Sequence, residues 1–169
     1  MQPKNITLIG MPGSGKSSVG RLLAERLQYR FIDGDDLIRA TGRDLQEIID
    51  RDGEEELLRI EARVLCGLEG EQMLIAPGGS CVMSPRAMEH LREISLVVYM
   101  EVPCEVLVTR MQDMELRGIV GLHYMTLAEL YGIRHPLYRK YAHCILDFLA
   151  ETVEETATRL YSVCARSHS

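Results

Sequence analysis

Short apolar runs alternate with longer stretches of helical periodicity along the chain. An uninterrupted apolar run is typical of a parallel strand that is buried on both faces, because such a strand has no solvent side to make polar. This pattern favours an α/β fold of three layers, with a parallel sheet between two layers of helices. The predicted strands cover residues 6–9, 29–33, 73–76, 94–101 and 143–147.

The helical stretches lie between these runs. In residues 16–27, apolar side chains recur at the three- and four-residue spacing of one helix face. Ser84 and Pro85 provide a cap and a first-turn proline for a later helix. We find no linker or repeat, so we expect one domain over residues 1–169. The predicted helices cover residues 16–27, 44–70 with a break near 52–53, 84–92, 103–111, 125–141 and 151–165.

Residues 10–17 read G-M-P-G-S-G-K-S, which matches the phosphate-loop pattern G-x-x-x-x-G-K-[ST]. The loop lies between a predicted strand and a predicted helix, as a working phosphate loop must, whereas a ligand-free Gly-rich turn needs neither neighbour. Its amides would face phosphate oxygens at the positive end of the helix. We expect Lys16 to be an exposed side chain that reaches the β- and γ-phosphates, and Ser17 to hold Mg²⁺. The predicted nucleotide contacts in this loop are Gly13, Ser14, Gly15, Lys16, Ser17 and Ser18.

Composition narrows the class of protein. The five cysteines are scattered and form no C-x-x-C pair, which argues against a zinc site or a disulfide framework and for a reducing compartment. A net charge of −6 disfavours nucleic-acid binding, and no apolar run is long enough for a membrane span. Asn5 is the only asparagine, so the N-K-x-D element of guanine-specific switch proteins is absent. We therefore expect a cytoplasmic, monomeric protein that acts on a small molecule, with neither nucleic acid nor membrane as a partner.

A second acidic element, residues 33–36, directly follows the second predicted strand. Clustered carboxylates repel one another unless a cation or hydrogen-bond donors compensate them. We assign Asp33 to the metal, through water, and Asp35 to the hydroxyl of the phosphoryl acceptor. The alternative is that these residues form an acidic N-cap for a following helix.

Taken together, the motifs resemble those of the shikimate kinase family, from about residue 4 to about residue 147. The resemblance implies a five-stranded parallel sheet of the nucleoside-monophosphate-kinase type, a mobile lid over residues 111–125, and phosphoryl transfer from ATP with Mg²⁺ to shikimate, giving shikimate 3-phosphate. The matching pieces are G-M-P-G-S-G-K-S-S-V-G at 10–20, D-G-D at 33–35, T-G-R at 41–43, D-G-E at 52–54, R-I-E at 59–61, P-G-G at 77–79 and R-H-P-L-Y at 134–138.

The resemblance also carries roles to single residues. Lys16, Asp35 and the lid residue Arg117 match the catalytic set, with Arg117 also touching the nucleotide. Arg110 matches the arginine that stacks on adenine. The residues that match the acceptor site are Asp35, Gly78, Gly79 and Arg134.

Two positions depart from the family pattern on the acceptor side. Leu57-Leu58 stands where family members usually carry an aromatic residue and an arginine that binds the shikimate carboxylate. Arg59 is the nearest arginine and is assigned to substrate binding, although one residue turns it by about 100° around a helix. Pro77 stiffens a turn that the family usually builds from three glycines.

These departures leave alternatives to shikimate open. One is another small hydroxylated metabolite such as homoserine, whose ammonium could pair with Glu61 or Asp35. A second is a nucleotide or nucleoside kinase of the same fold. A third is a catalytically idle homologue that binds a nucleotide and regulates.

Overall fold

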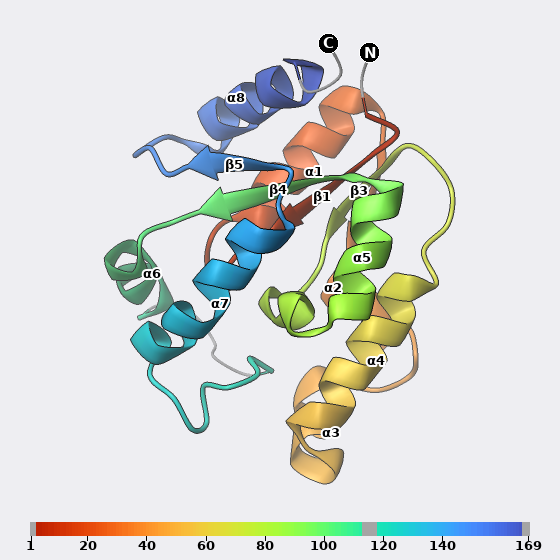
Figure 1. The fold of residues 1–169 in the computed structure, drawn as a ribbon, viewed down its shortest axis with the longest axis vertical. Helices are drawn as coiled ribbons and strands as arrows, with labels where there is room; N and C mark the ends of the chain where they lie inside the picture. The colour runs from red at the N-terminus through yellow and green to blue at the C-terminus, as the bar shows by residue number, and fades with distance from the viewer. Residues whose placement is uncertain (1–2, 113–117, 167–169) are drawn as a thin grey trace.

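The computed structural model describes residues 3–112 and 118–166. Its centre is a sheet of five parallel strands in the order β2-β3-β1-β4-β5 (Figure 1). The predicted five-stranded parallel sheet is therefore confirmed. The strands are β1 (Asn5–Ile9), β2 (Arg30–Asp33), β3 (Met73–Ala76), β4 (Leu96–Glu101) and β5 (Cys144–Asp147).

Helices cover both faces of the sheet, which makes the three predicted layers (Figure 1). On one face α1 and α8 pack together, and on the other α4, α5 and α7 bury their apolar sides. The helices are α1 (Lys16–Leu27), α2 (Gly34–Arg39), α3 (Leu45–Asp52), α4 (Glu54–Cys66), α5 (Pro85–Ile94), α6 (Cys104–Met111), α7 (Leu127–Tyr141) and α8 (Val153–Arg166), with a short 3₁₀ turn, η1 (Gly79–Met83).

Several predicted boundaries shift by a few residues. The stretch predicted over 44–70 breaks at Gly53, where a φ of 86° interrupts the helix, and α4 already ends at Cys66. Helix α5 continues to Ile94, and β4 starts only at Leu96, the first residue that pairs with β1. The predicted helices do not include η1, and they include α2 only through the N-cap alternative for residues 33–36.

A small apolar cluster holds α2, α3 and α4 together beside the carboxyl ends of β2 and β3. Its buried members come from these three helices and from Val120, which precedes α7. The cluster thereby fixes one wall of the space above the sheet edge. Its buried residues are Ile38, Leu45, Ile48, Leu57, Ile60 and Val120.

All strands run in the same direction, so their carboxyl ends meet at one edge of the sheet. In open α/β sheets this edge is where ligands bind. The phosphate loop, Asp33 and residues 76–79 all leave the sheet there. None of the helices in the part of the chain that the structure describes is both long and apolar enough to span a bilayer.

Candidate active site

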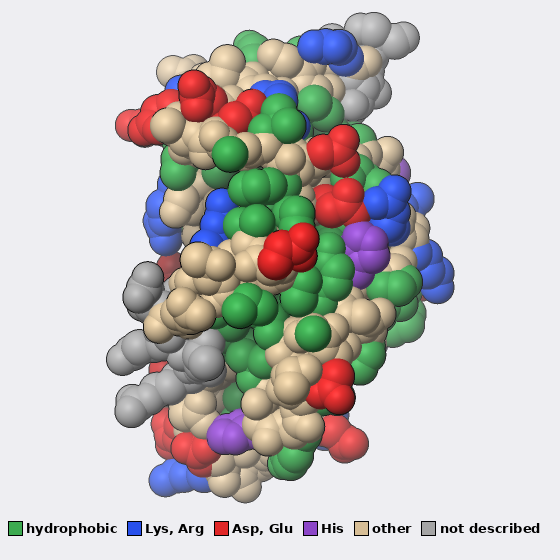
Figure 2. All heavy atoms as spheres, turned by 90° about the vertical axis from the view of Figure 1, so that its left-hand side faces the viewer, with side chains coloured by type: hydrophobic (Ala, Val, Ile, Leu, Met, Phe, Trp, Pro, Cys, Tyr) green, Lys and Arg blue, Asp and Glu red, His purple; other side chains and the backbone are tan. Residues whose placement is uncertain are grey.

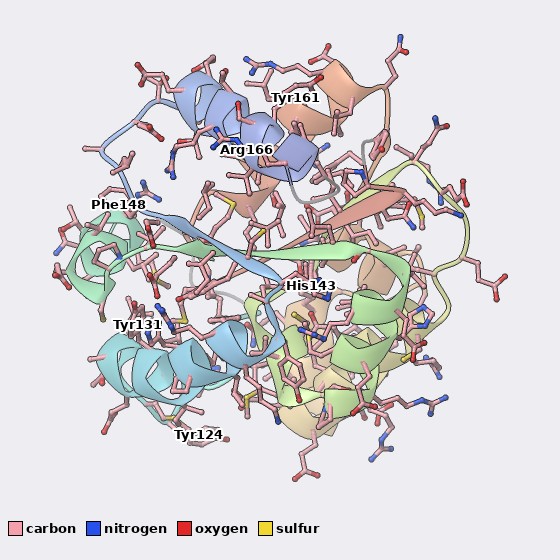
Figure 3. All side chains as sticks on the ribbon, turned by 45° about the horizontal axis from the view of Figure 1, so that its top comes forward. Tyr124, Tyr131, His143, Phe148, Tyr161 and Arg166 are labelled. Atoms are coloured by element: carbon pink, nitrogen blue, oxygen red, sulfur yellow. The ribbon has the colours of Figure 1, made fainter. Side chains whose placement is uncertain are left out.

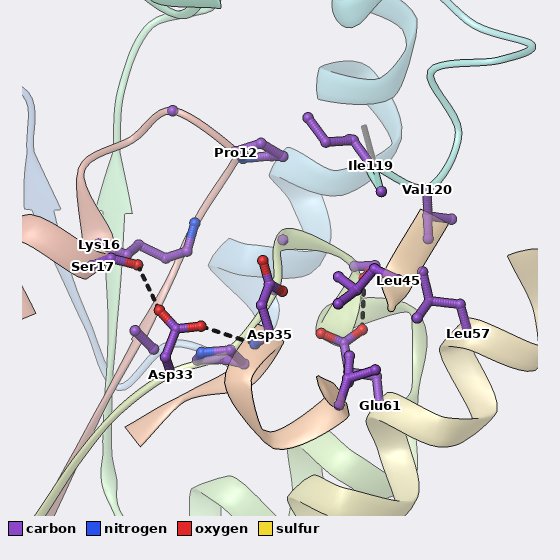
Figure 4. A pocket seen from close by; sticks show the side chains of 18 of the residues that line it. Pro12, Lys16, Ser17, Asp33, Asp35, Leu45, Leu57, Glu61, Ile119 and Val120 are labelled. Carbon is purple, nitrogen blue, oxygen red and sulfur yellow. Dashed lines mark hydrogen bonds between the residues drawn. The ribbon is translucent and has the colours of Figure 1, made fainter. Parts of the chain in front are cut away.

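A cavity of about 470 Å³ opens at this edge, between the phosphate loop, α2, α4 and α7 (Figure 4). One end is formed by the phosphate loop and Asp33, and the other by Asp35, Glu61 and the turn after β3. The two ends therefore face each other across one continuous space. Its lining residues also include the apolar side chains Ile38, Leu45, Leu57, Ile119 and Val120.

The phosphate loop is shaped to present backbone N–H groups. Gly13 and Gly15 take positive φ angles of 79° and 91°, and no side chain caps the first turn of α1, which Gly15 precedes. A Cβ on Gly10 would lie 2.8 Å from the carbonyl oxygen of Met100, so only glycine fits there. The uncapped N–H groups are left to bind an anion. The loop residues assigned to the nucleotide all line a cavity. Ser14 lines a second cavity, which is described below, and this first cavity is lined by Gly13, Gly15, Lys16, Ser17 and Ser18.

Lys16 is buried, and our expectation of an exposed side chain is wrong. Only 8% of its surface is accessible, because the side chain folds back over its own loop. Its Nζ donates hydrogen bonds to the carbonyl oxygens of Gly10, at 2.8 Å, and Met11, at 2.9 Å. Burial lowers the pKa of Lys16 to about 8. The ammonium group therefore already lies inside the loop that would hold phosphate.

Asp33 has two roles at the end of β2. Its Oδ1 accepts hydrogen bonds from the backbone N–H of Asp35 at 2.9 Å and of Asp36 at 3.4 Å, which caps α2. This confirms the N-cap alternative for Asp33, and α2 is the following helix that the alternative requires. Its Oδ2 faces the phosphate loop and accepts a hydrogen bond from the Ser17 hydroxyl at 3.3 Å (Figure 4).

The pair formed by Ser17 and Asp33 suits a magnesium ion. A hydroxyl and a carboxylate oxygen are the hard donors that Mg²⁺ prefers, and the ion usually takes its other ligands from phosphate and water. Within residues 3–112 and 118–166, no group of three or more His, Cys, Asp or Glu side chains could hold a metal ion alone. These residues therefore fit an ion that arrives together with a nucleotide.

Asp35 points into the cavity from the first turn of α2 (Figure 4). Burial, followed by the negative charge of Asp33, raises the pKa of its carboxyl. A carboxylate in this position can accept a proton from a hydroxyl bound between it and the phosphate loop.

Arg134 brings a positive charge to the same space from α7. It is 1% exposed, and its Nη2 donates to the carbonyl oxygen of Val120 at 2.9 Å. Its Nε has no hydrogen-bond partner among the described residues. The guanidinium lies close to the turn after β3, since a Cβ on Gly79 would be 3.2 Å from Nη1. Such a buried, incompletely bonded guanidinium is suited to an anionic ligand.

Glu61 is a site residue that the sequence analysis names only as a partner for an ammonium group. It is 2% exposed, and its Oε2 accepts a hydrogen bond of 2.6 Å from the Ser80 hydroxyl. Burial raises the pKa of Glu61 to about 7. The R-I-E motif at residues 59–61 could have identified Glu61 as a site residue. No motif in the sequence identifies Ser80 in the same way.

The structure does not bring Arg59 to this site. Its side chain is 76% exposed and forms an ion pair of 3.0 Å with Glu56, one turn earlier on α4. Leu57 lines the cavity, and Leu58 packs against the apolar cluster beside it. The rotation of about 100° per residue around a helix therefore turns Arg59 to solvent.

A second cavity of about 240 Å³ adjoins the phosphate loop on the β5 side. Arg110 lies between the two cavities: its Nη1 donates to the carbonyl oxygen of Gly13 at 3.0 Å, and its guanidinium lies 5.5 Å from the centre of the Phe148 ring. Phe148 follows β5 beside α6 (Figure 3). An arginine over an aromatic ring forms a flat surface on which a base could stack. Phe148 is absent from the site residues predicted from the sequence.

Hydrophobic side chains gather on the face that carries β5, α6 and α7 (Figure 2). Leu149 and Val153, both partly exposed, belong to the wall of the second cavity. Apolar walls suit the base of a nucleotide.

Arg117 lies outside the described residues, as does part of the predicted lid. The residues after it do reach the cavity, because Gly118, Ile119 and Val120 line it. The Gly118 N–H donates to Gln46 Oε1 at 2.8 Å, which ties this segment to α3.

Comparison with known proteins identifies the family. The family model described as shikimate kinase matches residues 12–165. The chain belongs to the shikimate kinase family. Members are ATP-dependent phosphotransferases with an alcohol acceptor, and Mg²⁺ is the usual cofactor of such phosphate-loop kinases.

Individual relatives agree along most of the chain. The shikimate kinase of Dechloromonas aromatica is 36% identical over 148 residues, covering 85% of this chain and 81% of that protein. The shikimate kinase of Psychrobacter arcticus is 32% identical over 169 residues, covering 95% and 91%. Among solved structures, the shikimate kinase of Acinetobacter baumannii in complex with shikimate has a TM-score of 0.86 at 28% identity, covering 97% of this chain and 94% of that one.

Proposed function

We propose that this protein transfers the γ-phosphoryl group of ATP to a hydroxyl of shikimate, giving shikimate 3-phosphate and ADP. The observation that carries the proposal is the single cavity that joins Lys16 and Ser17 at one end to Asp35 and Arg134 at the other. It occurs in a chain of the shikimate kinase family, whose relative from Acinetobacter baumannii was solved with shikimate bound.

The acceptor end supplies a base and an anion partner. Asp35 takes the proton from the attacking hydroxyl as the new oxygen–phosphorus bond forms and the bond to ADP breaks. Arg134 pairs with the carboxylate of the acceptor, and its unused Nε leaves it with a donor to spare. The turn at Gly78 and Gly79 lets the acceptor approach the backbone.

The nucleotide end supplies positioning and positive charge. Ser17 and Asp33 would hold Mg²⁺, which neutralises charge on the β- and γ-phosphates when it is bound. Lys16 exchanges its hydrogen bonds to the Gly10 and Met11 carbonyls for bonds to phosphate oxygens. Arg110 and Phe148 flank the second cavity and take the adenine base.

One feature sets this site apart from the family pattern. Only Arg134 brings an arginine to the acceptor end among the described residues, because position 58 is leucine and Arg59 faces solvent. A carboxylate held by two arginines is bound more tightly than one held by a single arginine. We therefore expect a shikimate KM well above the ATP KM.

A coupled assay of ADP release tests the proposal. The panel contains shikimate, homoserine, other hydroxy acids, sugar acids and nucleosides, and Lys16→Met is the inactive control. We expect shikimate to have the highest kcat/KM, and Lys16→Met to abolish turnover. Activity of Lys16→Met within about tenfold of the wild type would contradict the role given to Lys16. Rapid turnover of homoserine with none of shikimate would overturn the choice of acceptor and keep the kinase assignment.

A further inference from the structure

Glu61 and Arg134 are both buried in the wall of the acceptor end, yet they do not form an ion pair in the part of the chain that the structure describes. The Glu61 carboxyl is held by Ser80 at 2.6 Å, whereas Arg134 bonds to the Val120 carbonyl oxygen. On its other side, Glu61 Oε1 lies against the backbone, since a Cβ on Gly78 would be 2.5 Å from it. The carboxyl is therefore enclosed, with little water to stabilise a charge.

The groups that face Glu61 come from four other elements. Ser80 and the Cys81 thiol lie on η1, and Asp35 on α2, Lys16 on α1 and Arg134 on α7 complete the set. Burial is the largest influence on the pKa of Glu61 and favours its protonated form, and the charge of Asp35 acts in the same direction. The Ser80 hydroxyl, Arg134 and a hydrogen bond from the Gly78 backbone act in the opposite direction and favour the ionised form.

The acceptor end holds more acidic groups than basic ones. At the acceptor end, the carboxyl groups of Asp35 and Glu61 lie with the guanidinium of Arg134. The other cations that line the cavity among the described residues, Lys16 and Arg110, are bonded to carbonyl oxygens of the phosphate loop. An anionic acceptor adds another negative charge, and α4 offers no arginine toward the cavity to compensate it, because Leu57 lies there. A proton on Glu61 removes the excess negative charge.

We propose that Glu61, held by Ser80, determines which acceptors the site takes: protonated, it admits an anionic hydroxy acid beside Arg134, and ionised, it disfavours one. Binding of shikimate then takes up a proton from solvent at a pH where free Glu61 is partly ionised. This inference rests on the proposed function, because it concerns the acceptor of that reaction.

The test measures shikimate KM and ATP KM from about pH 6 to about pH 9 for the wild type, Glu61→Gln and Ser80→Ala. We expect the wild-type shikimate KM to rise about tenfold for each unit by which the bound acceptor raises the pKa of Glu61. In Glu61→Gln, which keeps an oxygen for Ser80 and cannot ionise, the rise should vanish. In Ser80→Ala the rise of the shikimate KM should begin at higher pH, because ionised Glu61 loses the hydrogen bond from Ser80.

Calorimetry of shikimate binding in two buffers of different ionisation enthalpy gives an independent readout. We expect net proton uptake near neutral pH for the wild type and none for Glu61→Gln. The ATP KM is the control for Lys16, whose own pKa lies near 8.

Two results would contradict the proposals, and each would contradict a different one. A shikimate KM that rises equally with pH in the wild type and Glu61→Gln would overturn the inference and leave the proposed function standing. Absence of shikimate binding and turnover at every pH would overturn the proposed function, and the inference with it.

Discussion

The Tyr138 hydroxyl donates a hydrogen bond of 2.6 Å to the carbonyl oxygen of Gly79, which ties α7 to the turn after β3. The Tyr138 ring is fully buried and stacks on Tyr99 with ring centres 5.0 Å apart. Arg134 lies one turn earlier on the same side of α7. One helix face therefore positions both the acceptor turn and the guanidinium that lies beside it.

Tyr138→Phe should remove the hydrogen bond between α7 and the turn after β3 without leaving a cavity in the core. The phenyl ring keeps the stacking on Tyr99, but the Gly79 carbonyl loses its donor. Leaving a buried acceptor unpaired costs about 1–3 kcal/mol of unfolding free energy. We expect denaturant unfolding to show this loss, and the shikimate KM to rise more than the ATP KM. An equal rise in both would argue against a specific effect on the acceptor turn.

Gly79→Ala should displace Arg134. The added Cβ would lie 2.8 Å from Pro12 Cδ and 3.2 Å from Arg134 Nη1, both closer than ordinary contact. We expect the shikimate KM to rise at least about tenfold, with a smaller change in the ATP KM. Gly132→Ala in α7 is the matched control, because its Cβ meets nothing within 4 Å and alanine favours a helix by about 1 kcal/mol. Unchanged acceptor kinetics in Gly79→Ala would mean that the turn yields to the methyl group.

Asp33→Asn and Asp35→Asn should affect different kinetic quantities: the first the Mg²⁺ requirement, and the second kcat. Asparagine can still cap α2 at position 33, so the fold should survive, but the weaker metal ligand should raise the Mg²⁺ concentration needed for half-maximal activity. Asparagine at position 35 cannot take the hydroxyl proton and should lower kcat by about 10²–10⁴-fold. Steady-state kinetics against Mg²⁺ and shikimate separate the two effects. Identical profiles would contradict our division of roles.

Glu61 should make the fold less stable as pH rises. Its pKa is raised from 4.5 to about 7 in the folded protein, so between these values the folded state holds more protons than the unfolded state. The unfolding free energy should therefore fall across this window, by roughly 3 kcal/mol at most. Denaturant unfolding of the wild type and Glu61→Gln at several pH values measures it. The difference in unfolding free energy between the two proteins should depend on pH only within this window.

Leu58→Arg should bring the acceptor site closer to the family pattern. Positions 58 and 61 are one turn apart on α4, so an arginine at 58 can pair with Glu61 and lower its pKa. We expect a lower shikimate KM, because the added guanidinium offsets the negative charge of ionised Glu61. This KM should also vary less with pH, because Glu61 then stays ionised over a wider range. Leu58→Met is the control, because methionine, like arginine, has an unbranched side chain but carries no charge. If the two variants behave alike, the guanidinium does not reach the pocket.

The pattern of apolar runs was sufficient to predict the five strands and the larger helices, because strands buried on both faces leave a clear signal. The pattern of apolar runs did not indicate the short elements α2 and η1. Each has too few residues to show a periodicity, and α2 depends on the cap that Asp33 provides.

The nucleotide end was easier to predict than the acceptor end for a physical reason. The residues of the phosphate loop are contiguous, so a single sequence motif identifies all of them. The acceptor end combines Asp35, Glu61, Ser80 and Arg134 from four distant elements, and only folding shows that Ser80 meets Glu61. The burial of Lys16 was also missed, because a side chain that folds back on its own loop leaves no trace in the residue pattern.

The strand order has a consequence for how this enzyme can change. Because β1 lies in the middle of the sheet, the proposed acceptor residues Asp35, Gly78 and Gly79 follow the strands on one flank, β2 and β3. The second cavity lies beside the ends of β4 and β5 on the other flank. Substitutions on separate flanks share few contacts, so their effects on free energy should add. Substitutions at the proposed acceptor end, such as one at Leu58, should therefore change the choice of acceptor and leave the affinity for ATP unchanged.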